Sequence, residues 1–151
     1  MSIQAEQAQS SDSASASTST LAAPTYVLYS DRAVILGSLI GWPLGAGLLM
    51  TLNYLRLGDR SKAVACLALA ALATGIEYSV IHTIPAIFRP PLAIAVAFSM
   101  GAVAAGLQGQ AVASHVSHGG AKASLWSAAG VTLLCSAITL IILRGLGIAF
   151  W

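Results

Sequence analysis

The chain has 151 residues, of which 57% are hydrophobic and only 8% are charged, with a net charge of +2 at pH 7. A water-soluble domain usually carries about 25% charged residues, so this composition excludes an ordinary soluble domain and indicates an integral membrane protein. Because the net charge is small and no run of Lys or Arg occurs, we expect no nucleic acid as a partner.

The first 24 residues differ from the rest of the chain. They are rich in Ser, Ala, Thr and Gln and contain no aromatic residue. Such a composition cannot bury enough apolar surface to offset the entropy that is lost on ordering. The segment also lacks the basic start and the continuous apolar core of a secretory signal peptide. We therefore predict a disordered tail at 1–24 and one membrane domain at 25–151.

Four long apolar segments follow, and each can cross a bilayer as a helix. They cover residues 33–55, 63–88, 90–114 and 123–143, and about 20 apolar residues span the hydrocarbon core. The short connections favour antiparallel neighbours. The sequence thus predicts an all-α fold, a polytopic membrane protein with a four-transmembrane-helix up-down-up-down bundle. The expected helices run over about 33–56, 62–87, 90–114 and 122–148.

Small residues recur every four positions along the first and third predicted helices, which places them on one face of each helix. Close contact between membrane helices needs such residues, so we expect them to form packing surfaces. The packing candidates are Gly37, Gly41, Pro43, Gly45, Gly101 and Gly109. Pro43 is expected to kink the first helix without ending it. The alternative is that residues 41–45 form a discontinuous helix that lines a substrate site.

Glu77 is the acidic residue that falls inside a predicted span. An ionisable group in hydrocarbon is costly and is by default a functional candidate. It is either protonated or paired, and Arg144 lies toward the same side of the predicted bundle. Three interpretations stay open: a structural ion pair or hydrogen bond, a carboxylate of proton- or cation-coupled transport, and exposure at a water-filled indentation.

Other polar residues lie within or near the predicted spans. His82 is five residues after Glu77 and points about 140° away around the helix, so the two do not form a proton relay. Asn53 and Gln108 fall near the opposite membrane side, where a hydrogen bond between the first and third helices is the structural interpretation. The binding candidates are therefore Glu77, His82, Arg144, Asn53 and Gln108.

No motif in the sequence indicates catalysis or metal binding. Cys66 and Cys135 lie deep in apolar segments, and His115 and His118 have no further metal ligand nearby in the sequence. Nucleophile-elbow, phosphate-loop and dinucleotide-binding patterns do not occur. We predict a non-enzymatic protein with no cofactor and no metal.

The positions Tyr29, Ser30, Gly41, Pro43, Leu44, Asn53, Tyr54, Leu57 and Gly58 match a recurring pattern. Through them, residues 29–63 resemble the first helix of small, largely uncharacterised four-helix bacterial inner-membrane proteins, which reads Tyr-Ser, then Gly-Gly-Pro-Leu-Ala-Gly, then Asn-Tyr and Leu-Gly. This chain departs from the pattern at Trp42, where the second glycine stands, and at Gly45. The resemblance implies a bacterial inner-membrane location and no known activity.

Lys and Arg near the helix ends indicate the orientation, because cytoplasmic loops are enriched in them. In an up-down-up-down bundle one side carries Arg56, Arg60, Lys62 and Lys122, and the other side carries Arg32, Arg89 and Arg144. The excess favours the first side as cytoplasmic. Both termini are then expected on the non-cytoplasmic side of a multi-pass inner-membrane protein.

The leading hypothesis is a non-enzymatic inner-membrane protein that acts through helix–helix interaction within the bilayer. Besides the lipid bilayer, its partner would be a second copy, giving a homo-oligomer, or another membrane protein, as for an accessory or immunity-type protein. The alternative is a small proton- or cation-coupled transporter or channel that uses Glu77.

Overall fold

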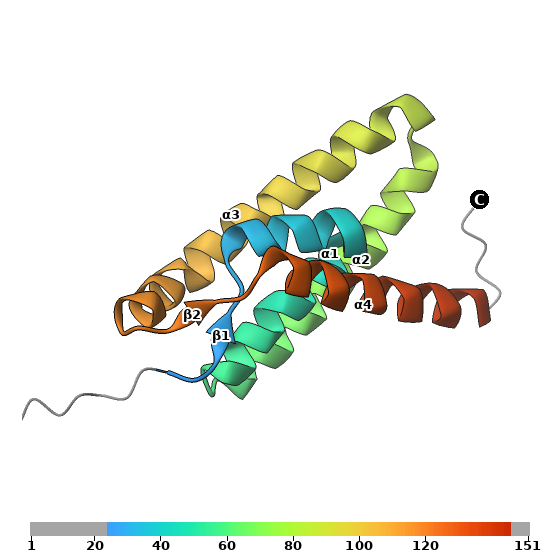
Figure 1. Ribbon diagram of the computed structural model, residues 1–151. Coiled ribbons are helices and arrows are strands. Elements are labelled where there is room, and N and C mark those ends of the chain that lie inside the picture. Colours follow the sequence, from blue (N-terminus) through green and yellow to red (C-terminus); the bar gives the residue numbers. More distant parts are fainter. Residues whose placement is uncertain (1–23, 146–151) are drawn as a thin grey trace, which may run out of the picture.

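The computed structural model describes residues 24–145 and is all-helical apart from two short strands (Figure 1). Its elements are β1 (Val27–Leu28), α1 (Asp31–Arg56), α2 (Arg60–Thr83), η2 (Ala86–Phe88), α3 (Arg89–Ser117), β2 (Ala121–Lys122) and α4 (Leu125–Gly145). Four helices are long and apolar enough to cross a membrane. The predicted tail at 1–24, except for its last residue, and the predicted end of the last helix at 148 lie outside the described residues.

α1 is broken in its middle. Gly41 and Trp42 have non-helical backbone angles, with φ 59° and ψ −169° at Trp42. Pro43 explains the position of the break, because a proline disfavours helical geometry in the residue before it and lacks the N–H of a helix interior. It also suits the first turn of a new helix. The expectation that Pro43 kinks the helix without ending it is wrong.

The two halves of α1, residues 31–40 and 43–56, fold back on each other as a hairpin. A straight helix would hold Tyr29 and Asn53 about 36 Å apart. Instead, the Asn53 side-chain oxygen accepts a hydrogen bond from the Tyr29 N–H, and its amide donates to the Tyr29 carbonyl, each at 2.8 Å. The single continuous rod expected across 33–56 is therefore replaced by two antiparallel half-helices.

Glycines allow the two half-helices to touch. A Cβ atom at Gly45 would lie 2.5 Å from the carbonyl oxygen of Gly37, and one at Gly37 would lie 2.8 Å from the side chain of Leu49. The contact at Gly45 is with backbone and leaves no room for a side chain, whereas a side chain at Gly37 would require Leu49 to move. The spacing of four, which marks one face of a straight helix, thus provides the contact between the two arms of a hairpin.

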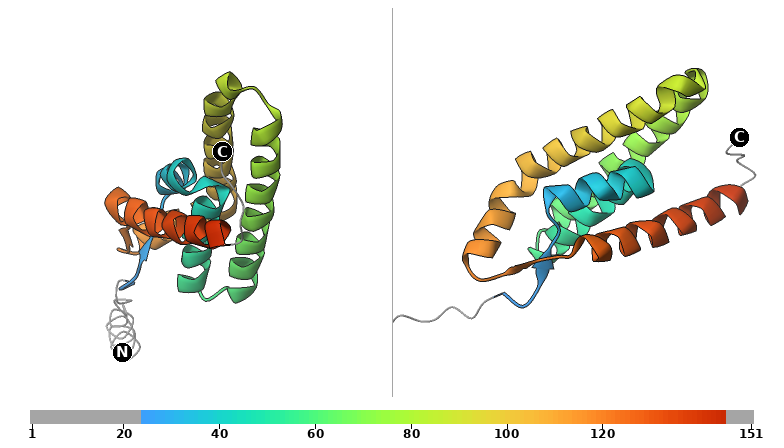
Figure 2. Two further views of the ribbon diagram at one scale, coloured as in Figure 1. Left: turned by 90° about the vertical axis from the view of Figure 1, so that its right-hand side faces the viewer. Right: turned by 45° about the horizontal axis from the view of Figure 1, so that its top comes forward.

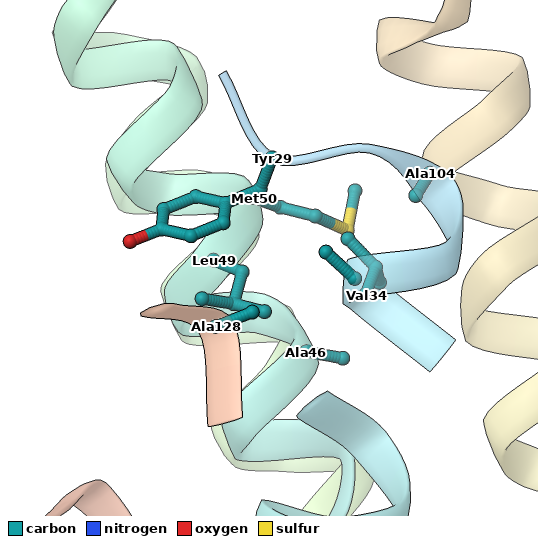
Figure 3. Close-up of a cluster of buried hydrophobic side chains, with 8 residues drawn as sticks. Tyr29, Val34, Ala46, Leu49, Met50, Ala104 and Ala128 are labelled. Atoms are coloured by element: carbon teal, nitrogen blue, oxygen red, sulfur yellow. The ribbon is translucent and has the colours of Figure 1, made fainter. Parts of the chain in front are cut away.

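The hairpin is the centre of the molecule, and α2, α3 and α4 each pack against it while making few contacts with one another. The apolar window of α1 is 61% buried, against 11%, 17% and 11% for the three outer spans. Figure 2 shows α4 diverging from the α2–α3 pair. The core cluster, drawn in Figure 3, joins both arms of α1 to α3 and α4; it contains Tyr29, Ala33, Val34, Ala46, Leu49, Met50, Ala104 and Ala128.

Both ends of α1 are fastened at the same end of the molecule. β1 pairs in parallel with β2, which connects α3 to α4. The Arg56 guanidinium donates a hydrogen bond of 2.6 Å to the Val27 carbonyl and lies over the Tyr29 ring. Next to it, Asp59 caps α2, and the hydrogen bond from the Lys62 side chain holds the pKa of the Asp59 carboxyl below its ordinary value.

Candidate functional site

The break in α1 lies at the floor of a cleft between α2 and α4. Because these two helices diverge, they leave a partly open cavity of about 370 Å³ over Gly41 and Trp42. Gly75 and Tyr78 of α2 line one wall, and Ser136 of α4 lines the other. The cleft is therefore built around the least regular backbone of the described chain.

Three hydroxyl groups around this cleft, those of Thr74, Ser136 and Thr139, are hydrogen-bonded to the backbone. The Ser136 hydroxyl lies 3.1 Å from the Ile40 carbonyl, next to the break, and 2.9 Å from the Thr132 carbonyl of its own helix. Thr74 and Thr139 donate to carbonyls one turn earlier in their own helices. With these donors occupied, the cavity presents a mainly apolar wall to a ligand.

Glu77 lies in a second cleft, on the other side of the break. This cavity of about 310 Å³ lies between α2 and α3, with Pro43 of α1 among its lining residues. Glu77 is only 9% exposed, and its Oε2 atom has no hydrogen-bond partner among residues 24–145. Two cavities thus flank the same interruption, one apolar and one with an acid.

The structure does not bring Glu77, His82 and Arg144 together. His82 is exposed, with its ring edge-on to Tyr78 at 4.6 Å between centroids. Arg144 is exposed at the end of α4. Within the described chain the ion pair that forms is Lys62–Asp59, at 2.7 Å. A structural bridge between Glu77 and Arg144, one of the three interpretations from the sequence, is not formed.

Asn53 and Gln108 form a closed hydrogen-bond network at the base of the hairpin. Besides its two bonds to Tyr29, Asn53 donates to the Gln108 side-chain oxygen at 2.8 Å. The Gln108 amide donates to the Met50 carbonyl at 2.9 Å. Both side chains are almost fully buried. Their groups are used in joining α1 to α3, so we assign them to structure and not to ligand binding.

The remaining packing candidates fall into two groups. Gly41 faces α4, where a Cβ would lie 3.2 Å from the Ser136 hydroxyl, and Gly101 of α3 makes room for the Ile35 side chain. Gly109, in contrast, has open space: a Cβ atom added there would meet nothing within 4 Å in the described chain. The expected packing stripe of α3 therefore ends, within one chain, before Gly109.

No group of three His, Cys, Asp or Glu side chains comes together within residues 24–145. No family model, curated protein or solved structure matches this chain. The resemblance of residues 29–63 to small inner-membrane proteins stays a prediction, but four of the positions on which it rests have defined roles in the hairpin. Gly41 and Pro43 break α1, and Tyr29 and Asn53 join its ends.

A discontinuous helix at 41–45 is the alternative that the sequence offers, and the structure does interrupt α1 at Gly41 and Trp42. The reversal of α1 and the two clefts beside it were not predicted. A signal for the break was present, because the residue before a proline is disfavoured in helical geometry. The two strands β1 and β2 have two residues each and carry no periodic pattern that could have predicted them. The clefts follow from how the outer helices diverge, which the sequence pattern does not specify.

Proposed function

We propose that α2, α3 and α4 cross a bacterial inner membrane, while α1 enters the bilayer and returns to the same side. Its two half-helices, of ten and fourteen residues, would rise about 15 and 21 Å. A hydrocarbon core is about 30 Å thick, so the break at Gly41 would lie near its middle. The attachment of both ends of α1 at β1 supports this arrangement.

This arrangement changes the expected orientation of the N-terminal region. With both ends of α1 on one side, Arg32 joins the positive residues there. That side then carries Arg32, Arg56, Arg60, Lys62 and Lys122, and the other side carries Arg89 and Arg144. Five Lys and Arg residues against two is a larger excess than the four against three of the straight bundle. It favours the side that holds both ends of α1 as the cytoplasmic side. Residue 24 would lie in the cytoplasm and the end of α4 outside it.

Within this arrangement we propose a non-enzymatic protein that binds the acyl chain of a lipid in the α2–α4 cleft. The observation that carries the proposal is the cavity of about 370 Å³ at the break of α1. Ligand sites in membrane proteins are often formed where helices are interrupted near the middle of the bilayer. An apolar wall with occupied hydroxyls suits a hydrocarbon chain better than a polar substrate.

Helix–helix interaction with a second copy or another membrane protein is the second candidate. The outward side of α3 favours it, because Gly106 is exposed there and has no neighbour within 4 Å of a Cβ in the described chain. Small residues without an internal contact allow another helix to approach closely. An accessory protein that holds a membrane partner would use such a surface.

One experiment separates the two candidates. The protein is extracted in native lipid discs, and native mass spectrometry reports its bound lipids and its number of copies. We expect a bound lipid in the wild type, at least a fivefold loss of occupancy in Gly75→Leu, whose side chain fills the cleft, and no loss in Gly130→Leu. Gly130 is the matched control because it has equal open space but does not line the cavity.

Equal lipid occupancy in all three proteins, or none in any of them, would refute the acyl-chain site. A ligand-free dimer would favour helix–helix interaction. Because Gly75 has nothing within 4 Å of a Cβ, the larger side chain has room, and a failure to fold is not the expected cause of a loss.

A further inference from the structure

Glu77 is a buried acid that does not line the α2–α4 cleft. It lies in the α2–α3 cleft, with 9% of its surface exposed and with Oε2 lacking a partner in the described chain. An unpartnered carboxylate in an apolar medium is costly, so it must carry a proton or meet a cation. The side chains of residues 24–145 do not supply that cation.

The walls of this cleft are almost entirely hydrocarbon. α2 contributes Ile76 and Val80, and α3 contributes Leu92 and Val96. Ser99 of α3 adds a hydroxyl, which donates a hydrogen bond to the Ala95 carbonyl. A small hydrated ion would find one carboxylate and at most one hydroxyl oxygen among these side chains, whereas Na⁺ or Ca²⁺ needs several oxygen ligands. An organic cation, by contrast, would gain from both the apolar walls and the single negative charge.

No other titratable residue of the described chain lines the cavity. On α2, His82 is exposed and contacts Tyr78, and Tyr78 itself lines the opposite cleft. On α3, Arg89 is exposed at the first residue of the helix. α1 contributes Pro43, which has no charge and no N–H. Glu77 is therefore the one ionisable side chain among the described residues that line this cavity, and no neighbouring positive charge there neutralises its carboxylate.

We propose that the α2–α3 cleft is a binding site for a hydrophobic organic cation, whose positive charge pairs with the Glu77 carboxylate in exchange for a proton. The cation releases the proton of the carboxylic acid when it binds, and the proton displaces the cation when it returns. The cavity of about 310 Å³ has the size of a small-molecule site. This inference rests on the proposed membrane placement and not on a lipid in the other cleft.

The test uses the full chain in lipid discs and tritiated tetraphenylphosphonium as the probe. We expect saturable binding that weakens as the pH is lowered, because protons compete for Glu77. Glu77→Gln keeps the shape of the side chain without its charge and should weaken binding at least tenfold. Asp59→Asn is the matched control, because it removes an acid outside the cleft and asparagine remains a good helix cap, and its binding should be unchanged.

A second measurement does not depend on a variant. Dicyclohexylcarbodiimide, which modifies protonated carboxyl groups in apolar surroundings, should label Glu77 of the wild type, and the phosphonium probe should protect it. Absent or non-saturable binding, equal binding by Glu77→Gln, or labelling that the probe does not reduce would each overturn the proposal. A protein that binds the probe but carries no lipid would refute the acyl-chain site alone.

Discussion

Trp42 carries the least favourable backbone of the described chain. Its φ of 59° with ψ of −169° is a combination that L-residues other than glycine rarely adopt, at a cost of about 1–3 kcal/mol. Pro43 disfavours a return of this residue to helical geometry. Glycine is the residue that these backbone angles favour.

Two substitutions at residue 42 measure the conformational cost of its backbone, because both remove the indole ring and they differ only in the Cβ atom. We expect Trp42→Gly to have a higher free energy of unfolding than Trp42→Ala, by about 1–2 kcal/mol, and therefore to unfold at a higher temperature. In a regular helix the order is reversed, and alanine is favoured by about 1 kcal/mol. Unfolding in detergent is the measurement. If the alanine variant is the more stable one, α1 is continuous at residue 42.

At the scale of elements, the hairpin depends on the backbones of its two arms being close together. Gly45 and Gly37 are in contact, and Asn53 joins the base of the hairpin to Tyr29 and to Gln108 of α3. The contact with Gly37 involves a carbonyl oxygen and not a flexible side chain, so it cannot yield to a larger residue by a rotamer change. Packing strain of this kind costs about 1–3 kcal/mol.

Alanine at Gly45 and at Gly109 should therefore have opposite effects. We expect Gly45→Ala to lower the free energy of unfolding by about 1–3 kcal/mol, because its Cβ meets the Gly37 carbonyl. Gly109→Ala has open space and should be neutral or should stabilise α3 by up to about 1 kcal/mol. Denaturant titration in mixed micelles gives both values. Equal losses at the two glycines would refute the hairpin contact.

The sequence predicted the helical class and the need for small residues in the first helix, because hydropathy and a spacing of four are local patterns. It did not predict which surface Gly37 and Gly45 face. The same spacing is compatible with a straight helix against a neighbour and with a hairpin that folds on itself. The hydrogen bond between Asn53 and Gln108 was predictable, but the bonds from Asn53 to Tyr29 join residues 24 positions apart, a separation that no helical period indicates.

For the candidate site, the sequence identified the acid but not its surroundings. Glu77 stood out because an ionisable residue in an apolar segment is rare. Its cavity depends on α2 and α3 each packing on α1 more than on one another, which is a property of the whole assembly. The same property creates the cleft over Trp42. Neither cleft follows from the residues of a single helix.

At the scale of the whole molecule, the central hairpin of α1 would replace one crossing of the expected bundle. The chain would cross the bilayer three times and not four, so the N-terminal region and the end of α4 would lie on opposite sides. The outer helices expose large apolar side chains such as Leu72, Phe98 and Ile141, as lipid-facing surfaces do. The fold is therefore organised around α1, the most buried of its four long helices.

The central claim is that α1 leaves the membrane on the side where it enters. It is tested by single-cysteine labelling in a chain with Cys66→Ala and Cys135→Ala, using a membrane-impermeant maleimide before and after lysis of spheroplasts. Thr25→Cys reports the start of α1, Ser61→Cys the side after it, and Ile87→Cys the α2–α3 connection; all three positions are exposed. We expect Thr25→Cys and Ser61→Cys to be labelled only after lysis, and Ile87→Cys to be labelled before it. If Thr25→Cys and Ile87→Cys are both labelled before lysis and Ser61→Cys only after it, or the reverse, then Thr25 and Ser61 lie on opposite sides. α1 would then cross the bilayer, which would contradict this account.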